Sequence, residues 1–336
     1  MRVLITGAGG FIARNLVEQL PEKYKITALN SKELNLLDPE YTYKYLKENC
    51  FDAVLHTATY DAAPKHSVKD PGKVLENNLR MFFNIARAED YYGKMIYFGS
   101  GAEFSRIHWK PMMSEDYFGS FIPQDQYGFS KYIMTRYALS RKKIINLRLF
   151  AVFGKYEDWR VRFISNACCR VIAGLAVKAK ENLLFDFLFI DDLVKIVDWF
   201  ISNTPDRNVY NVCTGKPVEF IKIAEIIFNL SGSKNEIILG KEGKANEYSG
   251  DNTLLTKEIN GFEFTPIEVA VGKLYNWYLK NQDIIDKEKR IFITSKTDSI
   301  VAYTDSSSYR FKPNYKILFP HTSKQFFLLK PNETSI

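Results

Sequence analysis

The sequence predicts an α/β protein built on a doubly wound parallel sheet, and three observations lead to this fold class. Strand-like and helix-like segments alternate from residue 2 to about residue 213, a pattern typical of a parallel sheet with helices on both faces. A glycine-rich turn, "TGAGGFIA", joins the first expected strand to the first expected helix. With 336 residues, 46% of them hydrophobic, the chain can bury one large or two smaller cores.

Each element of the first half follows from its hydrophobic spacing. Short apolar runs such as "RVLIT" predict strands, and runs with helical spacing such as "FIARNLVEQL" predict helices. The expected strands are 2–6, 25–30, 52–58, 94–100 and 144–154, and the expected helices are 11–20, 39–50, 68–90 and 126–142.

Beyond Lys155 the alternation loosens, which predicts a second, smaller lobe interleaved with the first. The segments expected there are a helix over 163–174, a strand over 183–190, a helix over 191–203, a strand over 208–214 and a closing helix within 261–280. We expect a dinucleotide-binding domain of residues 1–158 plus about 183–213, and a substrate lobe of about 159–182 plus 214–281. Short alternating apolar segments predict a β-rich extension over 282–336.

Charge and cysteine content narrow the function classes. The net charge is +7, but Lys and Arg are interleaved with Asp and Glu, which favours anionic small molecules over nucleic acid. The most apolar window, 183–201, carries five charged residues, too many for a membrane span. The four cysteines have neither metal-ligand nor disulfide-framework spacing, so we expect no metal site and a reducing cytoplasm.

The glycine-rich turn predicts a dinucleotide site of the Rossmann type. Gly7 allows a tight turn, Gly10 lets backbone approach a pyrophosphate, and the small Ala13 lets the helix pack on the sheet. The following helix, which begins at Phe11 and Ile12, presents free N–H groups and a partial positive charge to the phosphates. A turn of this composition that binds no ligand is the alternative.

Three residues in later segments predict oxidoreductase chemistry. Ser100 follows a strand, at the sheet edge where a cofactor crevice opens. Tyr127 and Lys131 are four residues apart, so they share one helix face with about 5–6 Å between their Cβ atoms. When hydride transfer reduces a ketone, the developing alkoxide needs a proton that a positioned phenol can supply. A chance Tyr and Lys pair on a solvated helix is the alternative.

Together these residues resemble the Ser/Tyr-x-x-x-Lys triad of the short-chain dehydrogenase/reductase family, in its extended branch of nucleotide-sugar epimerases, dehydratases and reductases. The resemblance covers residues 1 to about 281. It implies that the Lys131 ammonium favours the ionised form of Tyr127 and holds the nicotinamide ribose, and that Ser100 binds the substrate oxygen. It also implies that Thr57 and Ala58 in "HTAT", and Asn78 on the next helix, lie beside the cofactor.

The segment "NSKELNLLD" bears on the cofactor. Members that retain NAD usually have an acid at the end of the second strand, whereas here Asn30, Ser31 and Lys32 precede any acid. We therefore expect NADPH rather than NAD, with a 2′-phosphate near Ser31 and Lys32. The run resembles that of GDP-fucose synthase and dTDP-4-dehydrorhamnose reductase, both 4-ketosugar reductases, which implies that Leu37 and Asp38 contact the adenine. A helix cap at Ser31 or Asp38 is the alternative.

Departures from that pattern indicate the reaction. Where GDP-fucose synthase has the Cys and His that epimerise its substrate, this chain has Ala102 and Arg162. Glu103, where the family usually has an apolar residue, is either a substrate contact or a solvated side chain. The resemblance also assigns residues to the sugar-nucleotide site, with the arginines near the diphosphate: Ala102, Glu103, Arg160, Arg162, Asn166 and Arg170.

The resulting hypothesis is an NAD(P)H-dependent reductase of the C4 keto group of a nucleotide-activated 4-keto-6-deoxy sugar, in deoxysugar biosynthesis for surface polysaccharide. An NAD-retaining 4-epimerase or dehydratase, and a non-catalytic nucleotide-binding scaffold, are the alternatives. The resemblance further implies a homodimer formed through the helices near 73–90 and 126–141, although their apolar spacing is equally what a monomer needs.

Overall fold

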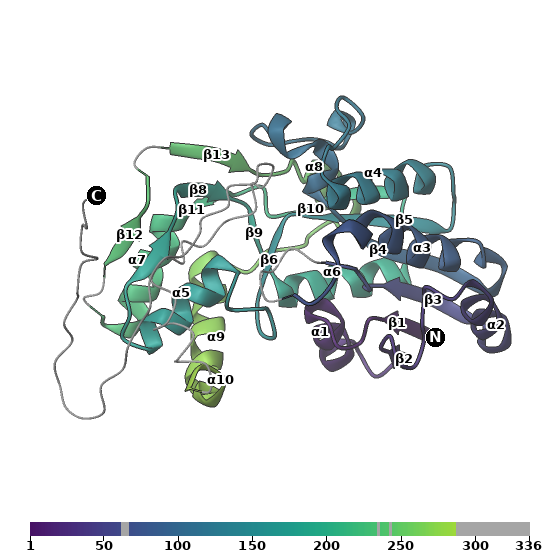
Figure 1. Ribbon diagram of the computed structural model, residues 1–336, viewed down its shortest axis with the longest axis horizontal. Coiled ribbons are helices and arrows are strands. Elements are labelled where there is room, and N and C mark those ends of the chain that lie inside the picture. The colour runs from purple at the N-terminus through teal and green to yellow at the C-terminus, as the bar shows by residue number, and fades with distance from the viewer. Residues whose placement is uncertain (62–66, 234–235, 242–243, 287–336) are drawn as a thin grey trace, which may run out of the picture. The chain divides into compact units, whose positions relative to one another are not determined.

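A computed structural model describes residues 1–61, 67–233, 236–241 and 244–286, with the side chains of 244–246 left out (Figure 1). Its main sheet has six strands in the order β10-β5-β4-β3-β1-β2, and every neighbouring pair is parallel. The predicted doubly wound α/β fold is therefore confirmed. The strands are β1 Arg2–Thr6, β2 Lys25–Leu29, β3 Phe51–His56, β4 Tyr92–Ser100, β5 Ile144–Leu149 and β10 Val209–Val212.

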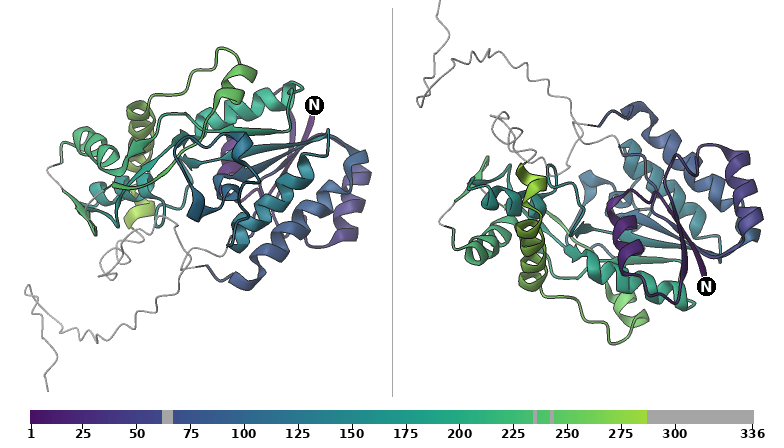
Figure 2. Two further views of the ribbon diagram at one scale, coloured as in Figure 1. Left: turned by 90° about the horizontal axis from the view of Figure 1, so that it is seen from above. Right: turned by 90° about the horizontal axis from the view of Figure 1, so that it is seen from below.

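Helices cover both faces of this sheet (Figures 1 and 2). Val3 and Ile5 of β1 pack into the core shared with α1 and α6, whereas Leu4 packs into the core shared with α2, α3 and α4. This alternation is what the two-residue period of a strand requires when both faces are covered. The helices are α1 Phe11–Gln19, α2 Pro39–Asn49, α3 Val74–Ala86, α4 Gln126–Ala138 and α6 Ile190–Ser202.

Strand β5 departs from an all-apolar pattern on one face. Ile145, Leu147 and Leu149 point into the core shared with α1 and α6. On the opposite face, Asn146 and Arg148 are both fully buried. Polar side chains buried in this position need partners within the protein, and these partners lie next to the candidate active site.

Among the described residues of 151–280, those outside β10 and α6 form small sheets and four helices. These sheets have the orders β11-β8-β13, β12-β7 and β6-β9. The expected strand 183–190 is split at Asp186, whose buried carboxylate accepts hydrogen bonds from the Thr214 and Gly215 backbone. The elements are β6 Ala151–Phe153, α5 Phe163–Ile172, β7 Val177–Ala179, β8 Asn182–Phe185, β9 Phe187–Phe189, β11 Val218–Glu219, α7 Phe220–Ser231, β12 Ile237–Leu239, β13 Lys244–Tyr248, α8 Thr253–Glu258 and α9 Ile267–Lys280.

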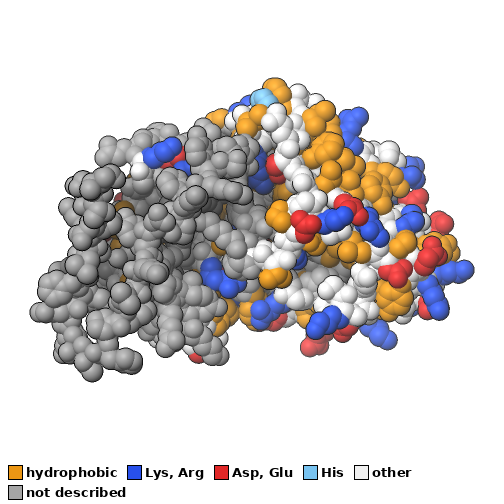
Figure 3. All heavy atoms as spheres, viewed as in Figure 1, with side chains coloured by type: hydrophobic (Ala, Val, Ile, Leu, Met, Phe, Trp, Pro, Cys, Tyr) orange, Lys and Arg blue, Asp and Glu red, His pale blue; other side chains and the backbone are white. Residues whose placement is uncertain are grey.

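The predicted domain division stays a prediction, because residues 1–286 all belong to one compact unit of the chain. The predicted β-rich extension begins as a helix, α10 Gln282–Asp286, and its apolar segments from residue 290 onward lie outside the described residues. Among the described residues, no helix combines the length and apolar character needed to cross a membrane. On the face drawn in Figure 3, basic and acidic side chains are intermixed rather than separated.

Candidate active site

The turn after β1 has the geometry that a dinucleotide pyrophosphate needs. Gly7 has a φ of +69°, and a Cβ added there would meet the Cα of Ala58 at 2.8 Å. Gly10 is the N-cap of α1 and supplies no side-chain cap to the helix. Because the first backbone N–H groups of the helix have no side-chain acceptor, they are free to bind an anion. The residues present therefore fit a bound dinucleotide.

The loop after β3 lies against this turn. Thr57 donates its hydroxyl hydrogen bond to the Thr6 carbonyl. Asn78 of α3 is buried, and its amide binds both the N–H and the carbonyl of Tyr60. Asn78 thus holds the loop that contains Thr57 and Ala58, which is a structural role within the predicted cofactor region.

The structure brings the predicted triad together at the carboxyl end of β4. Ser100 ends β4 and caps the 3-10 helix η3, Gly101–Phe104, by accepting from the Ala102 N–H at 3.2 Å. Tyr127 and Lys131 lie on α4, and the Lys131 Nζ is 5.8 Å from the Tyr127 ring centroid. A hydrogen bond with Ser100 acts to lower the pKa of Tyr127, so the two hydroxyls are neighbours.

Burial is the largest influence on the electrostatics of this triad. Burial raises the pKa of Tyr127, and Arg106 and Arg162 are the cations that act against this rise. Lys131 instead donates to the Phe98 carbonyl at 2.8 Å, and burial lowers its own pKa to about 8. Desolvation of the phenol thus outweighs the nearby cations, and the expectation that Lys131 favours the ionised form of Tyr127 stays a prediction. At neutral pH the phenol keeps its proton.

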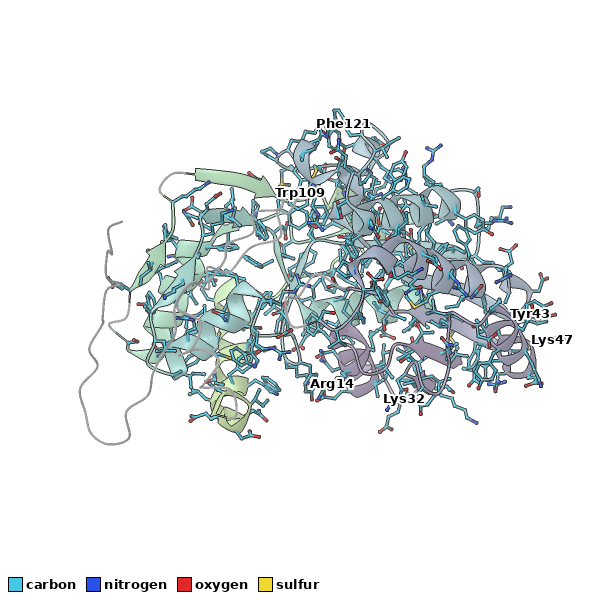
Figure 4. The ribbon with its side chains drawn as sticks, viewed as in Figure 1. Arg14, Lys32, Tyr43, Lys47, Trp109 and Phe121 are labelled. Atoms are coloured by element: carbon cyan, nitrogen blue, oxygen red, sulfur yellow. The ribbon has the colours of Figure 1, made fainter. Side chains whose placement is uncertain are left out.

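Three residues that sequence reasoning missed also line this region. Tyr248 of β13 lies beside Ser100, which acts against the rise in the Tyr248 pKa that burial causes. Its ring stacks on that of Trp109, which is labelled in Figure 4, with centroids 4.1 Å apart. The Trp109 indole donates to the Gly101 carbonyl. The Arg106 guanidinium lies 5.5 Å from the Trp109 ring centroid. None of the three stands in a spacing pattern, so no signal in the sequence pointed to them.

The end of β2 carries an acid after all. Glu33 folds back so that its carboxylate accepts from the Asn30 N–H at 2.9 Å, and the Asn30 side chain accepts from the Lys32 N–H. Ser31 and Lys32 are exposed on this turn, and Lys32 is labelled in Figure 4. The turn over 31–33 brings the acid three residues later in sequence back to the strand end.

Further along this segment, the helix-cap alternative holds for Asp38. Its carboxylate accepts from the Tyr41 N–H at 2.9 Å, so Asp38 is the N-cap of α2. The Leu37 carbonyl accepts from the Arg80 guanidinium of α3.

The predicted substrate residues fall into two groups. Ala102 and Glu103 are 1% and 0% exposed, so neither side chain presents surface to a substrate, and Glu103 is not a solvated side chain either. Its carboxylate is enclosed because it pairs with the Arg148 guanidinium at 2.8 Å.

The other four lie on or before α5. Arg162 is the exposed N-cap of α5, and exposed Arg160 pairs with Asp158 at 2.8 Å. Asn166 and Arg170 are buried on α5, and Arg170 donates to the Ala176 carbonyl. Of these residues, Arg162 is the one whose charge reaches Tyr127.

The six-stranded sheet, the glycine turn and the Ser100, Tyr127 and Lys131 arrangement together define a dinucleotide-binding oxidoreductase of the short-chain type. The model of the NAD dependent epimerase/dehydratase family matches residues 3–213, and the chain belongs to this family. It is an enzyme of the kind that modifies nucleotide sugars by oxidation and reduction.

Comparison with individual proteins agrees with this assignment. The chain is 21% identical over 309 residues to GDP-L-colitose synthase of Yersinia pseudotuberculosis, covering 84% of this chain and 100% of that one. A GDP-L-fucose synthetase from Naegleria fowleri bound to NADP has a TM-score of 0.73 at 17% identity, covering 84% and 93% of the two chains. GDP-mannoheptose C4 reductase from Campylobacter jejuni, with NADP bound, has a TM-score of 0.70 at 18% identity, covering 83% and 98%.

Proposed function

We propose that the protein reduces the C4 keto group of a nucleotide-activated 4-keto-6-deoxy sugar, with NADPH as the hydride donor. The observation that carries this proposal is a complete Ser100, Tyr127 and Lys131 triad beside Ala102 and Arg162, where an epimerising relative would need a Cys and a His. The two structural neighbours solved with NADP bound, one of them a C4 reductase, support it.

The bound dinucleotide would supply hydride to C4, and the protein residues would handle the oxygen. Ser100 would hold O4 by a hydrogen bond. Because burial raises the pKa of Tyr127, its phenol is protonated at neutral pH and can donate a proton to O4 as negative charge develops. The pKa of Lys131 is about 8, so below pH 8 its side chain is a positively charged ammonium close to the reacting oxygen.

A Tyr127→Phe variant tests the triad. We expect kcat to fall by about 10²-fold or more, because general acid catalysis contributes roughly 10²–10⁴-fold. The measurement is NADPH oxidation with a panel of GDP-, CDP-, UDP- and dTDP-4-keto-6-deoxy sugars. Tyr137→Phe, on the same helix but packed against Phe82 and Phe83, is the matched control and should keep full activity. No oxidation of NADPH by the wild type with any of these sugars would reject the proposal.

An NAD-retaining 4-epimerase is the second candidate, and Glu33 is the observation that favours it. A carboxylate at the end of β2 suits the two ribose hydroxyls of NAD better than a 2′-phosphate. Exposed Lys32 on the same turn favours the phosphate, which is why NADPH is preferred here. The absorbance of the purified protein near 260 nm separates the two, since a permanently bound NAD would be visible there.

We further infer a homodimer in which α3 and α4 of two copies pack together. Leu139, directly after α4, is 53% exposed, and Met81 and Phe83 are only partly buried. Sedimentation equilibrium measures the mass, and a monomer at micromolar concentration would reject this inference.

A further inference from the structure

A group of six buried polar residues lies directly behind Ser100, and we call it the Glu103 cluster. Its members come from η3, α4 and three strands of the main sheet, and every one of them is fully buried. They are Tyr97, Glu103, Thr135, Asn146, Arg148 and Asn211.

Glu103 lies at the centre of this cluster. One carboxylate oxygen, Oε2, accepts from Arg148 Nε and from Thr135 Oγ1, each at 2.8 Å. Thr135 also hydrogen-bonds the Tyr97 hydroxyl at 2.7 Å and accepts from Asn146 Nδ2 at 2.8 Å. The buried carboxylate is thus matched by a cation and by neutral donors, as a buried charge requires.

The second oxygen of the same carboxylate reaches the catalytic turn. Glu103 Oε1 accepts from the Ser100 N–H at 3.0 Å. The strand beside it leaves room for this contact, because a Cβ added to Gly99 would lie 2.3 Å from Glu103 Oε1 and 2.2 Å from Asn146 Oδ1. Any larger residue at position 99 would displace the carboxylate from Ser100.

Thr135 connects the cluster to the other two triad residues. It lies four residues after Lys131 and eight after Tyr127 on α4, so the three share one helix face. The charge of Glu103 also acts to raise the pKa of Lys131. Titratable neighbours of Lys131 among the described residues also include His56 of β3, which burial keeps neutral, and Tyr127 of its own helix.

We propose that Glu103 is a positioning residue that fixes Ser100 relative to helix α4, and thereby sets the geometry of Ser100, Tyr127 and Lys131. This inference rests on the proposed reductase function, in which those three residues act together. The carboxylate bonds Ser100 directly and bonds α4 through Thr135, so a change in it moves Ser100 against the helix that carries Tyr127 and Lys131. The charge of the same group supports the ammonium form of Lys131.

The first test is Glu103→Gln, which keeps the size of the side chain but loses the charge and one acceptor. We expect kcat to fall by about 10–100-fold, since a small misplacement of catalytic groups costs up to about 10²-fold, while KM for the sugar changes little. Glu157→Gln is the matched control, because Glu157 is also buried but bonds Ser165, away from the triad. This control should keep the wild-type kcat.

The second readout does not depend on turnover. The ¹³Cε signal of Lys131, identified by its loss in Lys131→Met, should titrate near pH 8 in the wild type and at a lower pH in Glu103→Gln. A wild type that reduces no sugar would reject the proposed function. The titration would still test whether Glu103 supports the ammonium form of Lys131. Unchanged kcat and an unchanged Lys131 titration in folded Glu103→Gln would overturn the proposal.

A milder variant guards against loss of folding. Thr135→Val leaves the Glu103–Arg148 pair in place and removes the bond to α4. We expect kcat to fall by roughly tenfold or less, the effect of one hydrogen bond, with the Lys131 titration close to that of the wild type. A folded Thr135→Val with full kcat would show that the hydrogen bond between Glu103 and Thr135 does not contribute to positioning the triad.

Discussion

Two buried carboxylates in different regions of the protein, Glu103 and Glu157, are accommodated in opposite ways. Behind Ser100, Glu103 faces the Arg148 guanidinium, which is itself covered by the rings of Phe104 and Phe118. Between α5 and α9, buried Glu157 accepts one hydrogen bond, from Ser165, and burial raises its pKa to about 7. Glu103 is therefore held by pairing it with a cation, and Glu157 by letting it take a proton.

The difference indicates what each region is for. A paired charge keeps a fixed set of bonds, and the Glu103 cluster uses them to join β4, β5, β10 and α4 next to the triad. The core between α5 and α9 holds Cys168, Cys169 and Tyr278 around Glu157, and burial raises the pKa of both thiols. That region packs mainly by apolar contact, so the protonation state of Glu157 can change with pH.

The largest expected effect comes from removing the cation of the first region. Arg148→Met leaves the Glu103 carboxylate buried without a counter-charge, which should lower the free energy of unfolding by about 3–5 kcal/mol. Urea denaturation measures this change. Adding Glu103→Val should restore most of the loss, because replacing both partners of a buried pair with apolar residues is often neutral. A loss of less than about 1 kcal/mol in the free energy of unfolding for Arg148→Met alone would mean that Arg148 is not needed to compensate the buried charge of Glu103.

The next prediction concerns Glu157 and pH. The folded-state pKa of Glu157 lies above its unfolded value, so the folded protein binds the proton more strongly. The contribution of this proton to the free energy of unfolding is lost as the pH rises through 7. Glu157→Gln cannot ionise, so it should match the wild type near pH 4.5 and exceed it by about 3 kcal/mol above pH 7.5. Thermal unfolding across this range measures the difference, and an offset independent of pH would contradict the assignment.

Much of the fold and part of the site were predictable because they depend on short-range spacing. The alternation of strands and helices, the Gly7 to Ala13 turn and the four-residue separation of Tyr127 and Lys131 are all local patterns. Glu103 was misjudged because its partner Arg148 is 45 residues away, and only the parallel pairing of β4 with β5 brings them together. The burial that raises the pKa of Tyr127 could not be foreseen for a related reason, since burial cannot be read from spacing.

Other site residues could not be predicted from the sequence for the same physical reason. Tyr248 meets Ser100 through a strand of the second lobe, far away in sequence and without a motif. One signal was available in hindsight: the alternation of Asn146 and Arg148 with apolar neighbours in β5, set beside an acid in the apolar position 103, indicates a buried ion pair.

The smallest expected effect compares two tyrosines, one in each region. Tyr97 and Tyr278 are both fully buried, but the Tyr97 hydroxyl bonds Thr135 at 2.7 Å, whereas that of Tyr278 makes no hydrogen bond of normal geometry within the described part of the chain. Tyr97→Phe should lower the free energy of unfolding by about 1 kcal/mol, and Tyr278→Phe should leave it unchanged or raise it slightly. Parallel urea denaturation of the two variants gives the contrast directly. Equal losses in the free energy of unfolding would mean that the two tyrosine hydroxyls are hydrogen-bonded to the same extent. The contrast between the two regions would then depend on Glu103 and Glu157 alone.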